Sequence, residues 1–223
     1  MPLTPELAAW RKAERARLLA VRTAANSKDH NRWSEAIAET LKDVCPAHTG
    51  WVVGLCWPFQ AEFDARPVAE LFRAKGARLA LPAVVAKAQP LEFLEWWPGV
   101  PLVEGVFGLL IPENTAKLVP DLLLVPPVGI GAEGDRLGYG GGFFDRTLAS
   151  LDPRPLTFAH AFELSRVPTT HPQPHDILMD FVITEAGIEA AIPGGLERVT
   201  AAECRARALK IAAARGLPRP PVP

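Results

Sequence analysis

The stretch "DLLLVPPVGIGAEGDRLGYGGGFFDRTLASL", Asp121 to Leu151, decides the fold. Its first part, Asp121–Ile130, is the most apolar segment of the chain, which predicts a strand buried on both faces. Five glycines then fall within Gly134–Arg146, and helical periodicity begins at Phe143. Because glycine costs backbone entropy, this density indicates that a bare backbone is needed there. A buried strand, a glycine turn and a helix are together typical of a phosphate site, where backbone N–H groups and the helix N-terminus attract anions.

The segments around this stretch alternate between strand and helix patterns. Helices are predicted over residues 5–26, 31–44, 65–76, 143–151 and 200–216, and strands over 51–57, 77–85, 90–97, 121–130, 156–162 and 180–187. The alternation predicts an α/β fold: one three-layer domain with a mostly parallel central sheet flanked by helices. The domain is expected to span residues 1–216, followed by a flexible proline-rich tail over 217–223.

The composition excludes several classes of function. The formal net charge of −1 argues against a general nucleic-acid binder, which needs a strongly basic surface. A membrane span and a signal peptide are both unexpected, since apolar runs are short and the N-terminal segment is charged. The three cysteines have no metal-ligand spacing, and an odd count suits a reducing compartment. These features predict a cytoplasmic protein that has neither nucleic-acid nor membrane partners.

The glycine loop matches neither of the common nucleotide-binding motifs. Phe143 follows Gly142, where a P-loop would have Lys, and the glycine spacing is not that of the dinucleotide fingerprint. Even so, Arg136 is suited to a bidentate phosphate contact, and the Asp145 carboxylate to a Mg²⁺ ion that bridges phosphates. The alternative is a tight turn that closes a sheet edge.

The segment "RLGYGGGFFDRTLA" resembles the signature of the 5-formyltetrahydrofolate cyclo-ligase (methenyltetrahydrofolate synthetase) family. Further segments resemble the family in the same order: "WPFQAEFDARPVAELFRAKG", "DLLLVPPVGIGAEGDRLG" and "HPQPHDILMDFVITEAG". The resemblance implies the fold type that cyclo-ligases share with CoA-transferases. It also implies the conversion of 5-formyltetrahydrofolate and ATP to 5,10-methenyltetrahydrofolate, ADP and phosphate, with Mg²⁺. The partners would be small molecules, a reduced folate and ATP, and the protein a monomer or weak homo-oligomer.

The resemblance assigns site residues position by position. Asp145 and Asp176 would bind the metal, and Arg136 and Asp145 would be catalytic. The folate would contact Trp57, Glu62, Tyr139, Gly140, Gly141, Gly142 and Phe143. The nucleotide would contact Arg11, Arg15, Arg136, Leu137, Gly138, Tyr139, Gly140, Gly141, Gly142, Phe143 and Phe144.

Two positions depart from the family pattern. Phe144 stands where the family usually has Tyr, and Arg11 stands where it has Lys. A non-catalytic or redirected folate- or nucleotide-binding relative is therefore the alternative function, and a sugar-phosphate isomerase is a third.

Several single residues also keep a second interpretation. Asp176 is suited to a turn, Asp180 competes for the metal role, and Trp57 is suited to the core. Arg11 and Arg15 are equally suited to a solvated helix face, whereas Cys56 is expected to be structural. His175 is expected to hydrogen-bond rather than to carry protons.

Overall fold

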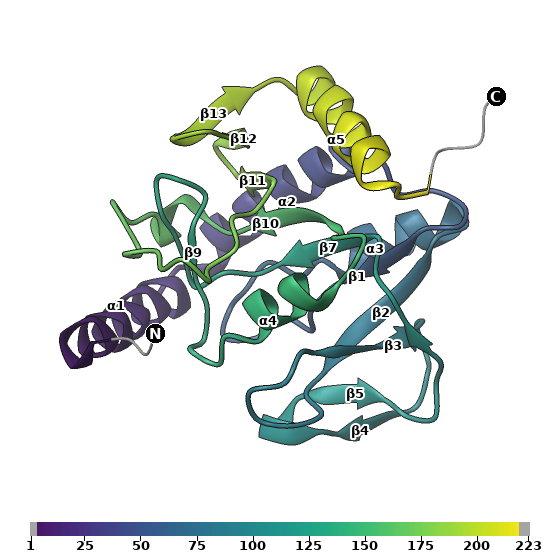
Figure 1. Ribbon diagram of the computed structural model, residues 1–223, viewed down its shortest axis with the longest axis horizontal. Coiled ribbons are helices and arrows are strands. Elements are labelled where there is room, and N and C mark those ends of the chain that lie inside the picture. Colours follow the sequence, from purple (N-terminus) through teal and green to yellow (C-terminus); the bar gives the residue numbers. More distant parts are fainter. Residues whose placement is uncertain (1–3, 219–223) are drawn as a thin grey trace.

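The central feature of the computed structural model, which describes residues 4–218, is a nine-stranded sheet in the order β13-β12-β11-β10-β7-β1-β2-β3-β6 (Figure 1). The strands are β1 (Val52–Gly54), β2 (Arg78–Ala83), β3 (Glu92–Trp96), β4 (Leu102–Glu104), β5 (Leu110–Pro112), β6 (Lys117–Leu118), β7 (Leu122–Val125), β8 (Gly129–Ile130), β9 (Arg136–Leu137), β10 (Leu156–His160), β11 (Phe181–Thr184), β12 (Gly187–Ile192) and β13 (Gly195–Val199). Strands β11, β10, β7, β1 and β2 run parallel, and antiparallel strands complete both edges. The predicted α/β class with a mostly parallel sheet is confirmed.

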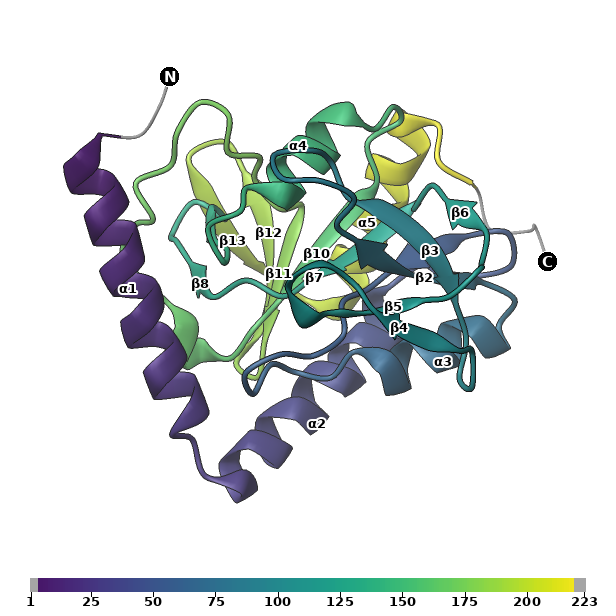
Figure 2. The ribbon, with the colours of Figure 1, turned by 90° about the horizontal axis from the view of Figure 1, so that it is seen from below.

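Helices cover both faces of the sheet. They are α1 (Pro5–Thr23), α2 (Ser27–Val44), α3 (Arg66–Ala74), α4 (Phe143–Ser150) and α5 (Ala201–Arg215), with short 3-10 turns at Val106–Gly108 and Glu163–Ser165. Figure 2 shows α4 on one side of the sheet and α2 and α3 on the other. The larger apolar cluster joins α2, α3 and α5 to one face of the sheet. A smaller cluster joins α4 to the opposite face.

Strand β7 shows why the sheet is buried on both faces. Leu122 and Leu124 belong to the larger cluster, whereas Leu123 and Val125 belong to the smaller one. Successive side chains of a strand point to opposite faces, so a central parallel strand needs an unbroken apolar run. All four side chains are at most 1% exposed.

The predicted strand 121–130 is too long. Strand β7 ends at Val125, and Pro126 and Pro127 follow, which have no N–H group to donate to a ladder. The chain then leaves the sheet, and β8 (Gly129–Ile130) pairs with β9 (Arg136–Leu137) in a separate two-stranded hairpin. The glycine loop therefore follows this hairpin rather than the central strand itself.

Other element boundaries also differ from the prediction. Helix α2 begins at Ser27 rather than residue 31, because the Asn26 side chain caps it by accepting from the Asp29 N–H at 2.9 Å. The hairpins β4–β5 and β12–β13 are absent from the prediction. Leu217, at the start of the predicted tail, is only 4% exposed, and residues 219–223 lie outside the described residues. Among residues 4–218, no helix is long and apolar enough to cross a membrane.

Candidate functional site

Helix α1 carries a row of residues along one face, and each contacts a different part of the site. Arg11, Leu18 and Arg22 are buried, with Arg15 between them on the same side at helical spacing. Leu18 packs into a small cluster with Val128 and Leu137, which fixes α1 against the β8–β9 hairpin. Figures 1 and 2 both show α1 beside this hairpin.

Arg11 joins α1 to the segment that contains Asp176. Its guanidinium donates to the Thr170 carbonyl at 3.2 Å, to the His171 carbonyl at 3.0 Å and to Asp176 Oδ2 at 2.7 Å. The Gln173 N–H also donates to Asp176 Oδ2, at 2.8 Å. Asp176 therefore has the turn role that its sequence context allows, and in addition it binds a buried cation.

Arg136 makes a corresponding pair with Asp145. Its Nη2 lies 2.7 Å from Asp145 Oδ1, and its Nη1 donates to the Ile177 carbonyl. The Ile177 N–H donates to Asp145 Oδ1 at 3.0 Å, so Asp145 lies beside the residue that follows Asp176. Burial lowers the pKa of Arg136, while Asp145 and Asp176 act in the opposite direction. The predicted acidic pair is thus brought to one place from segments far apart in the chain.

The free oxygens of this pair are compatible with Mg²⁺. Among the described residues, the side-chain hydrogen bonds of Asp145 all use Oδ1, and the neighbour of Asp176 Oδ1 is the His175 ring, 3.7 Å away. Within residues 4–218 there is no group of three or more His, Cys, Asp or Glu side chains that could hold a metal ion. Magnesium is commonly bound through one or two carboxylates together with substrate phosphates. Two carboxylates with one oxygen each to offer fit that chemistry.

The glycine loop, residues 138–142, lies against Arg15. A Cβ atom placed on Gly140 would come within 3.2 Å of the Arg15 guanidinium. The φ of Gly140 is +95°, a backbone conformation that also favours glycine. The Arg15 Nε atom is buried and has no hydrogen-bond partner within the described part of the chain. Gly142, with φ of +61°, precedes the first residue of α4, Phe143. The Arg15 guanidinium, the glycine backbone and the N-terminus of α4 are therefore neighbours, an arrangement that favours a bound anion.

A second cluster lies at the other end of α1, around Glu62. The Tyr139 hydroxyl donates to Glu62 Oε1 at 2.6 Å and accepts from Arg22 Nη2 at 2.8 Å. Arg22 Nη2 is also 3.5 Å from Glu62 Oε1, and the Phe59 N–H donates to Glu62 Oε2 at 3.0 Å. Glu62 is 6% exposed. The contact between Tyr139 and Glu62 joins the glycine loop to the predicted folate-binding glutamate.

Burial sets the protonation of this cluster. It raises the pKa of Glu62, and the Tyr139 hydroxyl, Arg22 and the Phe59 N–H oppose that rise. It also raises the pKa of Tyr139, and Glu62 adds to that shift. Tyr139 therefore stays a neutral hydroxyl that donates to the Glu62 carboxylate.

Two further groups near the cluster have pKa values that burial shifts, His160 near Arg22 and Cys56 near Glu62. Burial lowers the pKa of His160 to about 3, and neither of its ring nitrogens has a hydrogen-bond partner among the described residues. Burial also raises the pKa of Cys56, which excludes a thiolate nucleophile there and agrees with the predicted structural role.

Trp57 packs against two other side chains. The Arg66 guanidinium lies 4.0 Å above its ring, and the Trp96 ring centroid is 6.4 Å away. Phe59 lies closer to the glycine loop, 5.8 Å from the Tyr139 ring.

The structure also explains Phe144 and Asp180. Phe144 is partly buried and packs on the smaller apolar cluster. Asp180 binds Arg215 at 2.6 Å and Thr157, so it is a structural acid rather than a competitor for the metal.

Two further residues, absent from the prediction, hold the site together. Arg22 follows Arg11 and Arg15 on the same face of α1, and that spacing was the available signal. Asp135, 2% exposed, accepts from the Thr170 N–H at 2.9 Å and from the Thr170 hydroxyl at 2.5 Å. Asp135 therefore ties the β8–β9 turn to the segment whose carbonyls Arg11 binds.

Comparison with known proteins identifies the family. The sequence model of the 5-formyltetrahydrofolate cyclo-ligase family matches residues 7–185, and the chain belongs to this family. The chain is 33% identical over 134 residues to the 5-formyltetrahydrofolate cyclo-ligase of Escherichia coli, covering 56% of this chain and 72% of the relative. It is 28% identical over 129 residues to that of Haemophilus influenzae, covering 53% and 69%. The family predicted from the sequence, and with it an enzyme class, is confirmed.

Two solved structures share the fold. The 5,10-methenyltetrahydrofolate synthetase of Aquifex aeolicus superposes with a TM-score of 0.69 at 24% identity, over 85% of this chain and 96% of the other. That of Mycoplasma pneumoniae superposes with a TM-score of 0.65 at 20% identity, over 78% and 98%.

Proposed function

We propose that the protein converts 5-formyltetrahydrofolate to 5,10-methenyltetrahydrofolate with MgATP, releasing ADP and phosphate. The observation that carries this proposal is the contact between Tyr139 and Glu62. Through this contact, the glycine loop has the arginines and carboxylates of the proposed phosphate site on one side and a buried hydrogen-bond acceptor on the other. On the first side, Arg15, Arg136 and the loop amides are suited to binding phosphate. The Glu62 carboxylate suits the amino and ring N–H donors of a pterin.

The proposed reaction has two steps. The formyl oxygen attacks the γ-phosphorus of ATP, the bond to the β–γ bridging oxygen breaks, and ADP leaves. N10 then attacks the formyl carbon, its proton passes to solvent, and the carbon–oxygen bond breaks with phosphate as the leaving group. The second step closes the ring without a covalent bond to the protein.

The residues would act mainly by positioning the two substrates and by neutralising phosphate charge. Arg136 and the amides of Gly140–Gly142 would hold the transferring phosphoryl group, with Arg11, Arg15, Leu137, Gly138, Phe143 and Phe144 completing the nucleotide contacts. Mg²⁺ held by Asp145 and Asp176 would neutralise phosphate charge. Glu62 and Tyr139 would orient the pterin, and Trp57, five residues before Glu62, would pack on its ring. We further propose that the protein acts in the cytoplasm as a monomer or weak homo-oligomer.

Formation of the methenyl product tests the proposal, because that product absorbs in the near ultraviolet. The wild-type protein with MgATP and 5-formyltetrahydrofolate should develop this absorbance, and omission of ATP should abolish it. If both ligands bind and the absorbance never develops, the protein is a non-catalytic relative.

The Asp145→Asn variant tests the metal role. Turnover should fall on the order of 10²–10³-fold, the loss typical when a group that stabilises transition-state charge is removed. Folate affinity should stay within about twofold, since Asp145 lies at the phosphate end. Glu35→Gln, an exposed acid on α2, makes the same chemical change away from the site and should keep full activity. An unchanged rate and Mg²⁺ dependence in Asp145→Asn would remove this residue from the metal site.

A further inference from the structure

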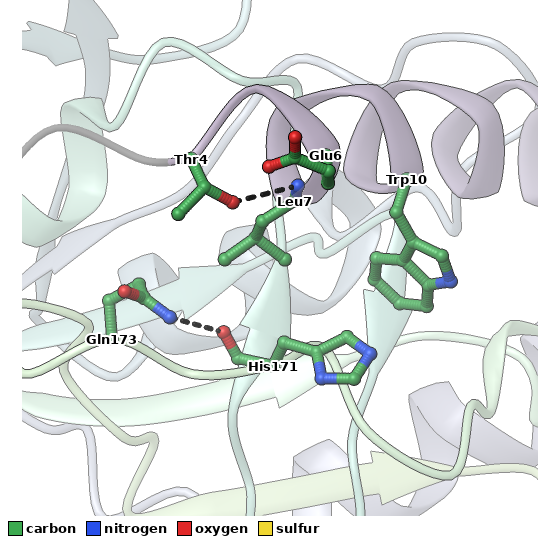
Figure 3. Close-up of a pocket in the computed structure, with 6 residues that line it drawn as sticks. All are labelled: Thr4, Glu6, Leu7, Trp10, His171 and Gln173. Atoms are coloured by element: carbon green, nitrogen blue, oxygen red, sulfur yellow. Dashed lines mark hydrogen bonds between the residues drawn. The ribbon is translucent and has the colours of Figure 1, made fainter.

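One pocket opens beside α1 and another beside α3, with volumes of about 430 and 380 Å³. Figure 3 shows the first, where Leu7 and Trp10 project from α1 toward the His171–Gln173 segment. Arg11, the next residue of α1, donates to the His171 carbonyl, so this pocket belongs to the site described above. The pocket beside α3 has Trp57 and Arg66 in its lining, and the role of Arg66 there is not explained by that site.

The Trp57 indole depends on its neighbours for its position. Trp57 lies in the connection between β1 and α3, so the backbone around it belongs to no helix or strand. Its side chain is partly buried against the larger apolar cluster. The Trp96 ring meets it edge to face, with planes at 89°. The Arg66 guanidinium carbon lies 4.0 Å from the ring centroid, which places a cation over the centre of one face.

Arg66 is itself held firmly. It is the first residue of α3, and its Nε and Nη2 donate to Asp64 Oδ1 at 2.8 Å and Asp64 Oδ2 at 2.7 Å. The Arg66 N–H also donates to Asp64 Oδ1, at 3.0 Å, so one carboxylate binds both the backbone and the guanidinium. A bidentate pair of this kind fixes the plane of a guanidinium as well as its position. Helix α3 in turn buries Val68 and Phe72 in the larger apolar cluster.

This arrangement supports the indole from a rigid element. A cation over an indole face is attracted by the negative charge of the ring face. Because the guanidinium covers the centre of that face, a second aromatic ring can stack on Trp57 only from the opposite face. A side chain that contacts a ligand is held in place when neighbouring contacts lock its rotamer, and Arg66 supplies such a contact to Trp57.

We propose that Arg66 is a positioning residue for the folate, which fixes the Trp57 indole so that the pterin packs on its other face. The inference rests on the proposed function for the contact between Trp57 and the pterin. Direct binding of a folate carboxylate by Arg66 is the rival interpretation. It is disfavoured because Asp64 already occupies the Nε–Nη2 edge of the guanidinium, and Glu70 adds a second acid to the lining of the same pocket.

A double-mutant cycle tests whether Arg66 acts through Trp57. 5-Formyltetrahydrofolate is titrated calorimetrically into the wild type, Arg66→Ala, Trp57→Ala and the double variant. Arg66→Ala should weaken folate binding about three- to fivefold, the usual size of a cation–π contact that is partly exposed, and should leave MgATP affinity unchanged. Trp57→Ala should also weaken folate binding. In that background Arg66→Ala should have no further effect, because the ring that Arg66 positions is gone.

Two further variants serve as rescue and control. Arg66→Lys keeps a cation for the ring but loses the bidentate pair, so its folate affinity should lie between those of the wild type and Arg66→Ala. Arg78→Ala removes a guanidinium whose bidentate pair, with Glu95 at 2.8 Å, matches that of Arg66, and it should keep the wild-type affinity. Equal urea midpoints for Arg66→Ala and Arg78→Ala would exclude a general loss of folding.

Three results would overturn the positioning role. The first is wild-type folate affinity in Arg66→Ala or in Trp57→Ala. The second is tighter folate binding by Arg66→Ala, which would mean that the guanidinium and the pterin compete for one face of the indole. The third is an equal loss from Arg66→Ala with and without Trp57, which would mean that Arg66 binds the folate directly.

Turnover separates this inference from the proposed function. If the wild-type protein forms no methenyl product while folate binding depends on Arg66 only when Trp57 is present, the reaction is wrong and the positioning role stands. If the wild-type protein turns over and Arg66→Ala keeps the wild-type KM for folate, the positioning role is wrong and the reaction stands. A raised KM for folate with unchanged kcat is the expected result for Arg66→Ala.

Discussion

Arg22 links the end of α1 to several separate backbone segments. It donates to the Gln60 carbonyl at 2.9 Å and to the Pro127 carbonyl at 3.4 Å, besides its contacts with Tyr139 and Glu62. Gln60 and Ala61 have φ of 47° and 58°, a left-handed conformation that costs energy for residues with a side chain. The bond from Arg22 stabilises this turn, which carries Glu62. One buried cation therefore helps to lower the pKa of the proposed pterin acceptor and also holds the turn that carries it.

His160 is a residue whose burial has a measurable thermodynamic consequence. It is 3% exposed, packs edge to face on Phe63 at 5.2 Å and has a pKa of about 3. In the unfolded chain a histidine has a pKa of about 6.5. Between these two values the unfolded state binds one more proton than the folded state, so the stability contributed by neutral His160 is lost as the pH falls.

The His160→Phe variant should remove this pH dependence. At pH 7 it should be at least as stable as the wild type, because two buried nitrogens without partners are replaced by an apolar ring. As the pH falls from 6 to 4, the wild type should lose up to about 1.4 kcal/mol per pH unit relative to the variant. Urea unfolding at several pH values measures the difference. His175→Gln, at a side chain that is 57% exposed, is the control, and parallel slopes for all three proteins would contradict the assignment.

At the scale of elements, helix ends are defined by local side chains. The Thr200 hydroxyl accepts from the Glu203 N–H, while the Glu203 carboxylate accepts from the Thr200 N–H at 2.8 Å, which is a complete capping box for α5. Gly216 ends the same helix in a left-handed conformation. Helix α5 in turn places Cys204, Ala208 and Ala212 in the larger apolar cluster.

The Thr200→Ala variant should therefore lower the free energy of unfolding by about 1 kcal/mol. The physical reason is that the Glu203 N–H loses its acceptor at the start of the helix. Thr200→Ser keeps the hydroxyl and should stay within a few tenths of a kcal/mol of the wild type. Chemical denaturation of the three proteins checks the order, and equal losses for Ala and Ser would show that the hydroxyl does not cap α5.

At the scale of the whole molecule, the proposed nucleotide site collects residues from α1, the β8–β9 hairpin, the glycine loop, α4 and the segment before β11. The contact of Arg11 with Asp176 joins residues 165 positions apart, and that of Arg136 with Ile177 joins residues 41 positions apart. An unfolded chain does not bring these groups together. Nucleotide binding is therefore coupled to folding of the entire domain.

This coupling predicts a large stabilisation by ligand. At a hundred times its dissociation constant, MgATP should raise the free energy of unfolding by about 2.7 kcal/mol. Removing Mg²⁺ with a chelator should reduce the gain, because the phosphate charge would then face Asp145 and Asp176 without compensation. Thermal unfolding with ATP, with MgATP and with chelator measures this. An equal stabilisation by ATP in the presence of chelator would contradict a metal role for the acidic pair.

Local patterns in the sequence determined the α/β class, the glycine loop ahead of α4 and the family. Helix and strand periodicity, caps and turn glycines act over a few residues, so they can be interpreted without knowing the fold. The same locality explains the errors. The apolar run over 121–130 predicts one strand although β7 ends at Val125, before Pro126 and Pro127, and the short hairpins have too few residues to show a pattern.

Only the tertiary structure decided which side chains meet. Arg11 and Asp176 are 165 positions apart, and Tyr139 and Glu62 are 77 positions apart. Their contacts follow from the strand order and from where Leu18 fixes α1 on the β8–β9 hairpin, both of which depend on burial of apolar surface across the whole chain. Phe144 faces apolar neighbours, and Trp57 lies under Arg66, for the same reason.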